Sequence, residues 1–258
     1  MKKYLISLEK DVKRRELFFA QPDTQDFSVF NAINTMNETE ENLTALFDAE
    51  GFAQRYGRNV TKGEIGCTLS HLAVYRLIEA DESIAEDEYC LVCEDDALFN
   101  QDFAYHLDCL LKQPLRADIV LVGQSKIPAF NHSELEINYP TTFSFLRKSI
   151  AGSPFKYAYT YRNYFAGTVA YLIKKSAAKA FLAASEKRLP FWLADDYILF
   201  GADFALEVCA VRPLLVIENP CLTSNLEDLR GSLQHNFWQK LIKYPAKKYL
   251  AVKRNLGR

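Results

Sequence analysis

The chain has 258 residues, which is enough for one large α/β domain or two small ones. Its 33 acidic and 31 basic residues nearly balance, so no overall field attracts nucleic acid, and we expect no nucleic-acid partner. No apolar run approaches the roughly 20 residues that a membrane-spanning helix requires, and Met1-Lys2-Lys3 leads directly into a strand-like segment instead of a signal peptide. The sequence therefore predicts a cytoplasmic protein.

The six cysteines fit that compartment because they are scattered along the chain. The Cys-x-x-Cys pair of Cys90 and Cys93 lies inside an apolar strand, and no second pair follows that would complete a zinc site. We interpret the cysteines as small buried side chains.

The chain opens with a pattern typical of a nucleotide-binding strand and helix. Residues 3–8 predict a strand, and a charged turn with Arg14 and Arg15 leads into a helix. The two arginines either face a diphosphate or form an exposed basic face. Residues 27–34 predict a second strand and its exit, and residues 40–56 an amphipathic helix. Neither a Gly-x-Gly-x-x-Gly motif nor a P-loop is present, so those phosphate cradles are not expected.

Residues 62–75 carry apolar side chains at helical spacing. Gly63 and Gly66 in the first turns weaken a helix, which indicates close approach of its backbone to a ligand or to another element. Ser70 and His71 follow in mid-helix, where a hydrogen-bonded histidine is favoured over a Ser-His nucleophile pair.

Glu94, Asp95 and Asp96 form a run of carboxylates after the apolar segment 89–93. The segment has the length and composition of a strand, so the acids are expected where a buried strand leaves its sheet. Adjacent acids stay ionised only if water, a cation or basic side chains offset their repulsion. Such oxygen ligands suit Mg²⁺ or Mn²⁺ that also holds the phosphates of a substrate. A solvated acidic turn is the alternative.

Regular elements continue beyond the acidic run, except in one long segment. We predict a helix at 102–111, strands at 118–123 and 165–173, and a helix at 174–184. Residues 124–162 are irregular and rich in aromatics, and a loop this long is usually functional or mobile. Its aromatic side chains are expected either to stack on sugar rings or to form a satellite core.

The last third of the chain holds a second acid pair and a basic tail. Asp195 and Asp196 lie among apolar and aromatic residues, where burial raises a carboxylate pKa and favours a base. The alternative is a helix N-cap with a first-turn acid. Residues 206–218 predict either a last strand pair or one long strand that Pro213 interrupts. Residues 239–258 carry seven basic residues and no acid, which is typical of a peripheral anchor to anionic lipid, with a solvated tail as the alternative.

Several blocks of this sequence together resemble glycosyltransferase family 25, the bacterial lipooligosaccharide-biosynthesis galactosyltransferases and their relatives. They are Ile6-Ser7-Leu8 with Arg14-Arg15, Gly63-Glu-Ile-Gly-Cys-Thr-Leu-Ser-His-Leu72, Glu94-Asp-Asp-Ala97, Gly167-Thr-Val-Ala-Tyr171 and Asp195-Asp196. The resemblance implies an α/β fold of the GT-A-like type, a single domain over residues 1–238 with a mixed, mostly parallel sheet flanked by helices. Residues 124–162 would be a loop insertion, and residues 239–258 a basic amphipathic tail.

The resemblance also implies a site. Asp96 would bind Mn²⁺ or Mg²⁺ that bridges the diphosphate of UDP, with His235 as a second ligand, and Asp195 or Asp196 would be the catalytic base. The nucleotide would contact Ser7, Leu8, Arg14, Ala32, Ile33, Asn34, Lys62, Gly63, Glu94 and Asp95.

The implied reaction is inverting transfer of a hexose from a UDP-sugar donor to a lipooligosaccharide or lipopolysaccharide core acceptor. It would take place at the inner face of the cytoplasmic membrane, with the basic tail on the anionic surface. Galactose is the expected sugar and glucose the alternative. A metal-dependent phosphohydrolase is a rival interpretation, but it would need further His or Asp ligands for a second metal. A non-catalytic protein of the same fold that binds glycan or membrane is another.

Overall fold

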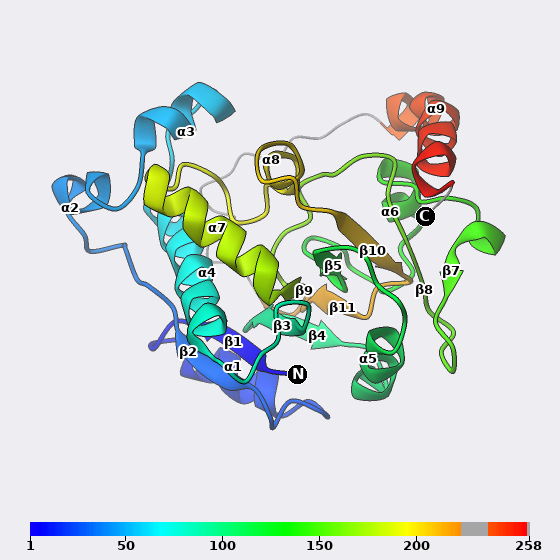
Figure 1. Cartoon of the computed structure of the whole chain (residues 1–258), viewed down its shortest axis with the longest axis horizontal. Coiled ribbons are helices and arrows are strands. Elements are labelled where there is room, and N and C mark those ends of the chain that lie inside the picture. Colours follow the sequence, from blue (N-terminus) through cyan, green and yellow to red (C-terminus); the bar gives the residue numbers. More distant parts are fainter. Residues whose placement is uncertain (223–236, 257–258) are drawn as a thin grey trace.

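The computed structural model describes residues 1–222 and 237–256, which form a mixed α/β fold with helices on both faces of a central sheet (Figure 1). The central sheet has eight strands in the order β2-β1-β3-β9-β5-β10-β8-β7. These strands are β1 (Lys3–Ser7), β2 (Ser28–Asn31), β3 (Tyr89–Glu94), β5 (Ile119–Leu121), β7 (Lys148–Ser149), β8 (Lys156–Ala158), β9 (Ala170–Lys174) and β10 (Val208–Arg212).

Most strands of this sheet point the same way. β1 pairs in parallel with β2 and β3, and β5 pairs in parallel with β10. β9 runs antiparallel between β3 and β5, and β8 runs antiparallel between β10 and β7. The predicted mixed, mostly parallel sheet flanked by helices is confirmed.

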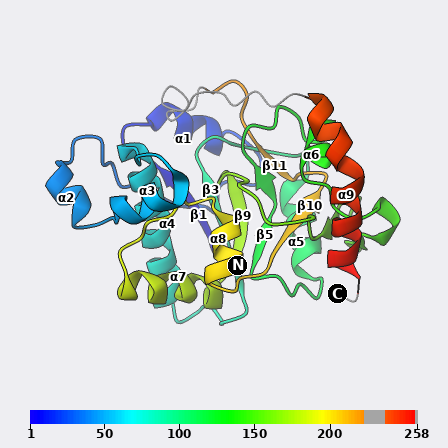
Figure 2. The same cartoon turned by 90° about the horizontal axis from the view of Figure 1, so that it is seen from above.

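Helices cover the sheet and extend beyond it at both ends of the molecule (Figure 1, Figure 2). They are α1 (Val12–Phe19), α2 (Glu40–Thr44), α3 (Ala49–Tyr56), α4 (Lys62–Ala80), α5 (Phe103–Leu111), α6 (Ser133–Asn138), α7 (Lys175–Lys187), α8 (Tyr197–Asp203) and α9 (Phe237–Asn255). A short 3-10 helix occupies Ser144–Leu146. Among the described residues, no helix has both the length and the apolar character needed to cross a membrane.

The sheet separates two apolar cores because successive side chains of a strand point to opposite faces. On β3, Cys90 and Val92 join the core beneath α4, α7 and α8. The alternate residues Leu91 and Cys93 join the core beneath α1 and α5. β3 is therefore buried on both faces, and its polar residues are confined to the end of the strand.

A second sheet of three strands lies beside that strand end. β4 (Ala97–Phe99) pairs antiparallel with β11 (Val216–Glu218), which pairs in parallel with β6 (Gly123–Gln124). The backbone N–H of Asn219 donates to the Asp96 carbonyl at 2.7 Å. This pairing brings the end of β11 next to the acidic run.

Several predicted elements are shorter or divided. The helix predicted at 40–56 is two helices, because the Asp48 side chain accepts from the Gly51 N–H and begins α3 afresh. The strand predicted at 118–123 divides into β5 and β6, which belong to different sheets. The strand predicted at 165–173 begins only at Ala170, because Gly167 before it adopts a left-handed φ of +72°.

The aromatic segment 124–162 contributes mainly to the core. Phe155, Tyr157 and Tyr159 are buried in the core beneath α1 and α5, whereas Phe143 and Phe145 are exposed. Phe155, Tyr157 and Tyr159 are therefore core residues, which is the second of the two alternatives predicted for the aromatic side chains. The segment also contains α6, the 3-10 helix, β7 and β8, so the prediction of an irregular loop was wrong in part.

Four of the six cysteines are buried as predicted, namely Cys90, Cys93, Cys109 and Cys209. The prediction was wrong for Cys221, which is exposed, and for Cys67, which is half-buried. Cys221 lies outside the strands and helices, whereas Cys67 lies on the face of α4 that lines a cavity at the edge of the sheet.

The basic tail forms α9, which lies beside α6 (Figure 1, Figure 2). Lys247 Nζ donates to the Asn138 carbonyl at 2.9 Å, and Arg254 donates to Asn163 Oδ1 at 2.6 Å. Part of the tail's positive charge is therefore used to dock the helix on the aromatic segment.

Candidate active site

The acidic run lies at the carboxyl ends of parallel strands, where α/β sheets usually bind ligands. Ile6 of β1 is in register with Glu94 of β3, so Ser7 and the residues after Glu94 leave the sheet at the same edge. β2 ends at this edge as well, one residue before Ala32. Polar side chains from separate segments therefore meet at one place.

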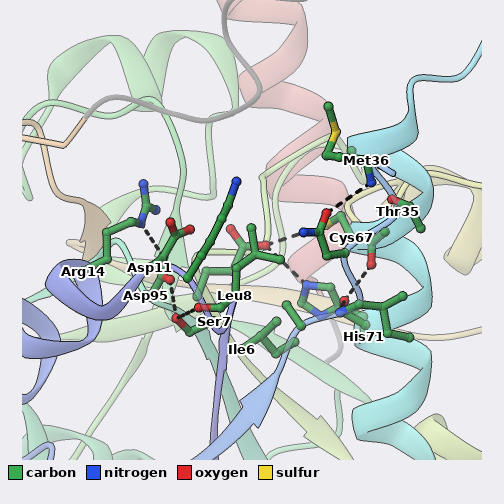
Figure 3. A pocket seen from close by; sticks show the side chains of 18 of the residues that line it. Ile6, Ser7, Leu8, Asp11, Arg14, Thr35, Met36, Cys67, His71 and Asp95 are labelled. Carbon is green, nitrogen blue, oxygen red and sulfur yellow. Dashed lines mark hydrogen bonds and ion pairs between the residues drawn. The ribbon is translucent and has the colours of Figure 1, made fainter. Parts of the chain in front are cut away.

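A cavity of about 290 Å³ occupies this edge. Figure 3 shows Arg14, Asp11 and Asp95 on one side of it and Thr35, Met36, Cys67 and His71 on the other. Its lining includes most residues that the resemblance assigned to the nucleotide and the metal, namely Ser7, Leu8, Arg14, Ala32, Ile33, Asn34, Gly63, Glu94, Asp95 and Asp96. Lys62 is next to the cavity, where its ammonium group bonds the carbonyls of Met36 and Glu38.

Asp95 is held by partners on β1 and α1. Ser7 Oγ donates to Asp95 Oδ2 at 2.6 Å, and Arg14 Nε donates to Asp95 Oδ1 at 2.6 Å. Burial raises the pKa of Asp95 above its usual value, although these two partners favour its ionised form. Arg15 bonds the carbonyls of Leu8 and Glu9 and so secures the turn after β1. Arg14 is paired with carboxylates and Arg15 with the backbone, and both are half-buried, so the prediction of an exposed basic face was wrong. Arg14 lines the cavity, and a contact of its guanidinium with a diphosphate stays a prediction.

Asp96 differs from Asp95 in the hydrogen bonding of its two oxygens. Arg14 donates to Asp96 Oδ2 at 3.0 Å, but among the described residues no donor reaches the buried Oδ1. Burial and the neighbouring charges of Glu94 and Glu218 raise the pKa of Asp96 to about 8, against the opposing effect of Arg14. A cation at Oδ1 would offset this repulsion, so the donor set fits Mg²⁺ or Mn²⁺.

Glu94 receives donors that come from α4 and from the chain before β9. Thr168 Oγ1 donates to Glu94 Oε1, and His71 Nε2 lies 3.3 Å from the same oxygen. Burial raises the pKa of Glu94, but the hydrogen bonds from His71 and Thr168 and the charge of Arg14 outweigh it, so the pKa is below its usual value. Glu94 is therefore the member of the run whose pKa is lowered, whereas the pKa of Asp95 and of Asp96 is raised.

A second cavity of about 290 Å³ adjoins the first, and Cys67, Glu94 and Asp96 line both. Asp195 and Glu218 line the second cavity only. Asp195 is half-buried, and its Oδ2 accepts from the Gly167 N–H at 3.1 Å. Together the two cavities reach the size of ordinary ligand sites, which is about 300–1,000 Å³.

Asp196 has a different environment from Asp195. Its side chain is 0% exposed, and Oδ2 accepts from Arg55 Nε at 2.8 Å and from Tyr56 Oη at 2.7 Å. Its Oδ1 accepts from the Leu199 N–H, which makes Asp196 the N-cap of α8. The N-cap alternative is thus observed for Asp196, and Asp195 is the member of the pair that lines a cavity.

α4 packs closely against the segment that follows β2. A Cβ added at Gly66 would lie 2.7 Å from the Ile33 carbonyl oxygen, so the close approach predicted from the two glycines is confirmed there. Ser70 Oγ donates to the Gly66 carbonyl and accepts from the Ile33 N–H. His71 is buried and hydrogen-bonded, as predicted, with Nδ1 2.7 Å from Tyr171 Oη.

Cys67, His71 and Thr168 are site residues that were not assigned a role from the sequence. A signal existed for the first two: Gly63, Gly66, Cys67, Ser70 and His71 recur at intervals of three and four, which places them on one face of α4. That face lines the first cavity. His235, predicted as a metal ligand, lies outside the described residues.

The sheet order and the acidic edge define a class of protein, namely a mixed α/β domain with an acid-lined cavity at the ends of its parallel strands. Residues 1–199 match the model of glycosyltransferase family 25 (LPS biosynthesis protein), and the chain belongs to this family. The predicted family is confirmed.

Human "Inactive glycosyltransferase 25 family member 3" is 29% identical over 133 residues, which are 48% of this chain and 22% of that protein. The rat "Probable inactive glycosyltransferase 25 family member 3" is 28% identical over 133 residues, 48% of this chain and 23% of that protein. The matched part thus spans less than a quarter of either relative.

Two solved glycosyltransferases are similar in overall arrangement. Galactosyltransferase LgtC in complex with donor and acceptor sugar analogues has a TM-score of 0.36 and 14% identity, over 81% of this chain and 73% of that one. GlyE from Streptococcus pneumoniae TIGR4 has a TM-score of 0.39 and 9% identity, over 98% of this chain and 62% of that one.

Proposed function

We propose that this chain is an inverting, metal-dependent glycosyltransferase that moves a hexose from a UDP-sugar to a lipooligosaccharide or lipopolysaccharide core acceptor. The observation that carries the proposal is the pair of adjoining cavities, with Asp96 on their shared wall and Asp195 on the wall of the second cavity alone. The donor nucleotide occupies the first cavity and the acceptor sugar the second. Membership of family 25 supports the same reaction class.

Asp96 and Glu94 are the residues proposed to hold Mn²⁺ or Mg²⁺, with Oδ1 of Asp96 as the available ligand atom. When bound, the ion neutralises charge that grows on the departing diphosphate. Asp95 is already bonded to Ser7 and Arg14, so its role is to orient those two side chains at the cavity. Arg14 adds positive charge on the side where the diphosphate would lie.

Asp195 is the proposed base. Its carboxylate takes the proton of the acceptor hydroxyl while that oxygen forms a bond to the anomeric carbon. The bond from the anomeric carbon to the UDP oxygen breaks at the same time, and UDP leaves with the electron pair. Attack from the face opposite the leaving group inverts the anomeric configuration. Asp196 is unsuited to this role because three donors already occupy its oxygens.

Galactose is the preferred donor sugar in this proposal and glucose the alternative. A non-catalytic protein that binds glycan or membrane is the second candidate, and the names of the human and rat relatives favour it. The enzyme and the binding protein differ in turnover. A binding protein of this fold would keep its affinity for UDP but would release no UDP from a UDP-sugar.

The deciding experiment is calorimetric titration of UDP with and without Mn²⁺ on the wild type and on Asp96→Asn. We expect Mn²⁺-dependent binding that the variant loses, while Asp87→Asn, an exposed acid away from the cavities, behaves as the wild type. An affinity for UDP that is the same with and without Mn²⁺, and the same in Asp96→Asn as in the wild type, would refute the proposed site. Transfer from UDP-galactose and UDP-glucose to core oligosaccharide, with the product anomer read by NMR, then tests the reaction.

Peripheral attachment to the inner membrane is also proposed, and α9 is the candidate surface. Ile242 is 79% exposed, Tyr249 and Leu250 are exposed too, and the exposed Lys243 and Lys253 supply positive charge. Replacing Ile242, Tyr249 and Leu250 by Glu should reduce cosedimentation with vesicles that contain anionic lipid. Leu46→Glu, an equally exposed leucine between α2 and α3, is the matched control. Equal sedimentation of both variants would exclude α9 as the anchor.

A further inference from the structure

A cysteine, a histidine and a glutamate converge where the two cavities meet. Cys67 and His71 lie four residues apart on α4 and so share one helix face, and Glu94 reaches them from the end of β3. One ligand atom from each side chain lies within 4.8 Å of the other two. We propose that Cys67, His71 and Glu94 form a zinc site, which shares Glu94 with the hard-cation site proposed at Asp96.

The two distances from Glu94 are close to those that tetrahedral zinc requires. Glu94 Oε1 lies 3.3 Å from His71 Nε2 and 3.8 Å from Cys67 Sγ. Zinc bonds of about 2.0 Å to nitrogen and oxygen and about 2.3 Å to sulfur place tetrahedral ligand atoms about 3.3 Å and 3.5 Å apart. The ligand atoms of His71 and Cys67 lie within 4.8 Å of each other, so an ion fits once these two side chains draw closer together.

Side chains behind the cluster can stabilise the tautomer of His71 that binds a metal through Nε2. Metal-bound histidines usually donate their other ring N–H to an acceptor that fixes the ring. His71 Nδ1 lies 2.7 Å from Tyr171 Oη, which in turn lies 2.7 Å from Tyr75 Oη. Either tyrosine hydroxyl can be the donor in that second bond. The chain of hydroxyls can therefore reverse, so that Nδ1–H donates to Tyr171 and the lone pair of Nε2 is released to the ion.

The ligand types select the metal. Thiolate and imidazole favour zinc over magnesium or manganese, whereas the carboxylates of Asp96 and Glu218 favour the harder ions. Three protein ligands leave the fourth zinc position open. All three residues line the first cavity, so an ion can enter from it and that position faces the ligand space. Cys67 thus has a role beyond the small buried hydrophobe expected from the sequence.

One consequence rests on the proposed function. Glu94 is also a proposed ligand of the catalytic metal, so zinc at the cluster would withdraw Glu94 and inhibit transfer. Zinc binding itself needs no turnover, and its test is independent of whether the protein is an enzyme.

The test is a spectroscopic titration of the full chain with Co²⁺ in a phosphine reductant. We expect visible bands of tetrahedral cobalt and a near-ultraviolet thiolate-to-cobalt charge-transfer band. Zn²⁺ should abolish both bands and Mg²⁺ should not, in keeping with the higher affinity of such sites for zinc. Absence of the charge-transfer band in the wild type would overturn the proposal.

Variants locate the bound ion. Cys67→Ser should lose the charge-transfer band, and Cys221→Ser, which changes an exposed cysteine, should keep it. Tyr171→Phe should keep the band with cobalt affinity about 10–100-fold weaker, as expected for a residue behind the ligand. Asp96→Asn should keep the band while losing Mn²⁺-dependent UDP binding, which separates this proposal from the proposed function. A band that persists in a folded Cys67→Ser protein, verified by circular dichroism, would place the metal elsewhere.

Discussion

The two acidic runs of this protein each contain one carboxylate that the fold saturates and one that faces ligand space. In the first run, Asp95 is held by Ser7 and Arg14, whereas Asp96 keeps a buried oxygen that no donor from residues 1–222 or 237–256 reaches. In the second, Asp196 accepts three hydrogen bonds and Asp195 lines a cavity. Asp96 and Asp196 are both buried, so burial alone does not distinguish a binding group from a structural one.

What distinguishes them is the number of donors that reach each carboxylate. Asp196 has Arg55, Tyr56 and the backbone of α8, whereas Asp96 shares Arg14 with Asp95 and lies near Glu94 and Glu218. A buried carboxylate with too few donors stays protonated or takes a cation.

Asp195→Asn should lower the rate of transfer about 100- to 10,000-fold, because an amide cannot accept the acceptor's proton. This is a barrier increase of roughly 3–5 kcal/mol. Initial rates at saturating donor measure it, with Asp203→Asn, an exposed acid of α8, as the control. A rate like that of the wild type would remove Asp195 from the mechanism.

Asp196→Ala should reduce the free energy of unfolding by about 2–4 kcal/mol, because it removes an N-cap and leaves Arg55 and Tyr56 without their acceptor. The estimate is below that of a fully buried pair because the Arg55 side chain is 30% exposed. Urea unfolding measures the loss. Asp195→Ala is the matched comparison, and the loss of the acceptor of the Gly167 N–H should cost about 1 kcal/mol. Equal losses in the two variants would contradict the contrast within this pair.

Asp96 should make the stability of the metal-free protein depend on pH. Its pKa is about 8 in the folded protein and about 3.9 in an unfolded chain, so the folded state keeps a proton that the unfolded state loses in between. The free energy of unfolding should therefore fall as pH rises from about 4 to about 8, by no more than about 1.4 kcal/mol per pH unit.

Urea unfolding at several pH values measures this slope. Asp96→Asn should flatten it, and Mn²⁺ should restore stability to the wild type most strongly near pH 8, where the ion no longer competes with a proton. An unchanged slope in the variant would mean that another group carries the pH dependence.

Glu218→Gln should have the smallest effect. Glu218 is one of the charges that raise the pKa of Asp96, after burial and Glu94. Removing its charge should lower the pKa of Asp96 in the folded protein by less than about one unit, and the upper end of the pH window moves down with it. A shift of one unit corresponds to roughly 1 kcal/mol in the free energy of unfolding. The same unfolding series gives the shift. A window that moves upward would show that Glu218 acts on Asp96 through contacts and not through charge.

Much of the fold was predictable because it depends on local patterns. The strand at residues 3–7, the helix that begins at Lys62 and the buried strand that ends in acids follow from alternation and helical spacing. The helix predicted at 40–56 failed because Asp48 bonds Gly51 and Arg188, and the second partner is 140 residues away. Spacing along the sequence carries no information about such a partner.

The sequence by itself determined that Glu94, Asp95 and Asp96 would emerge together at a sheet edge, and that two acids would precede α8. Only the tertiary structure decided which acid of each run is available. Arg55 lies 141 residues from Asp196, and Ser7 lies 88 residues from Asp95. The charge and hydrogen bonding of a carboxylate depend on the donors within a few ångströms, and these donors are brought by distant parts of the chain.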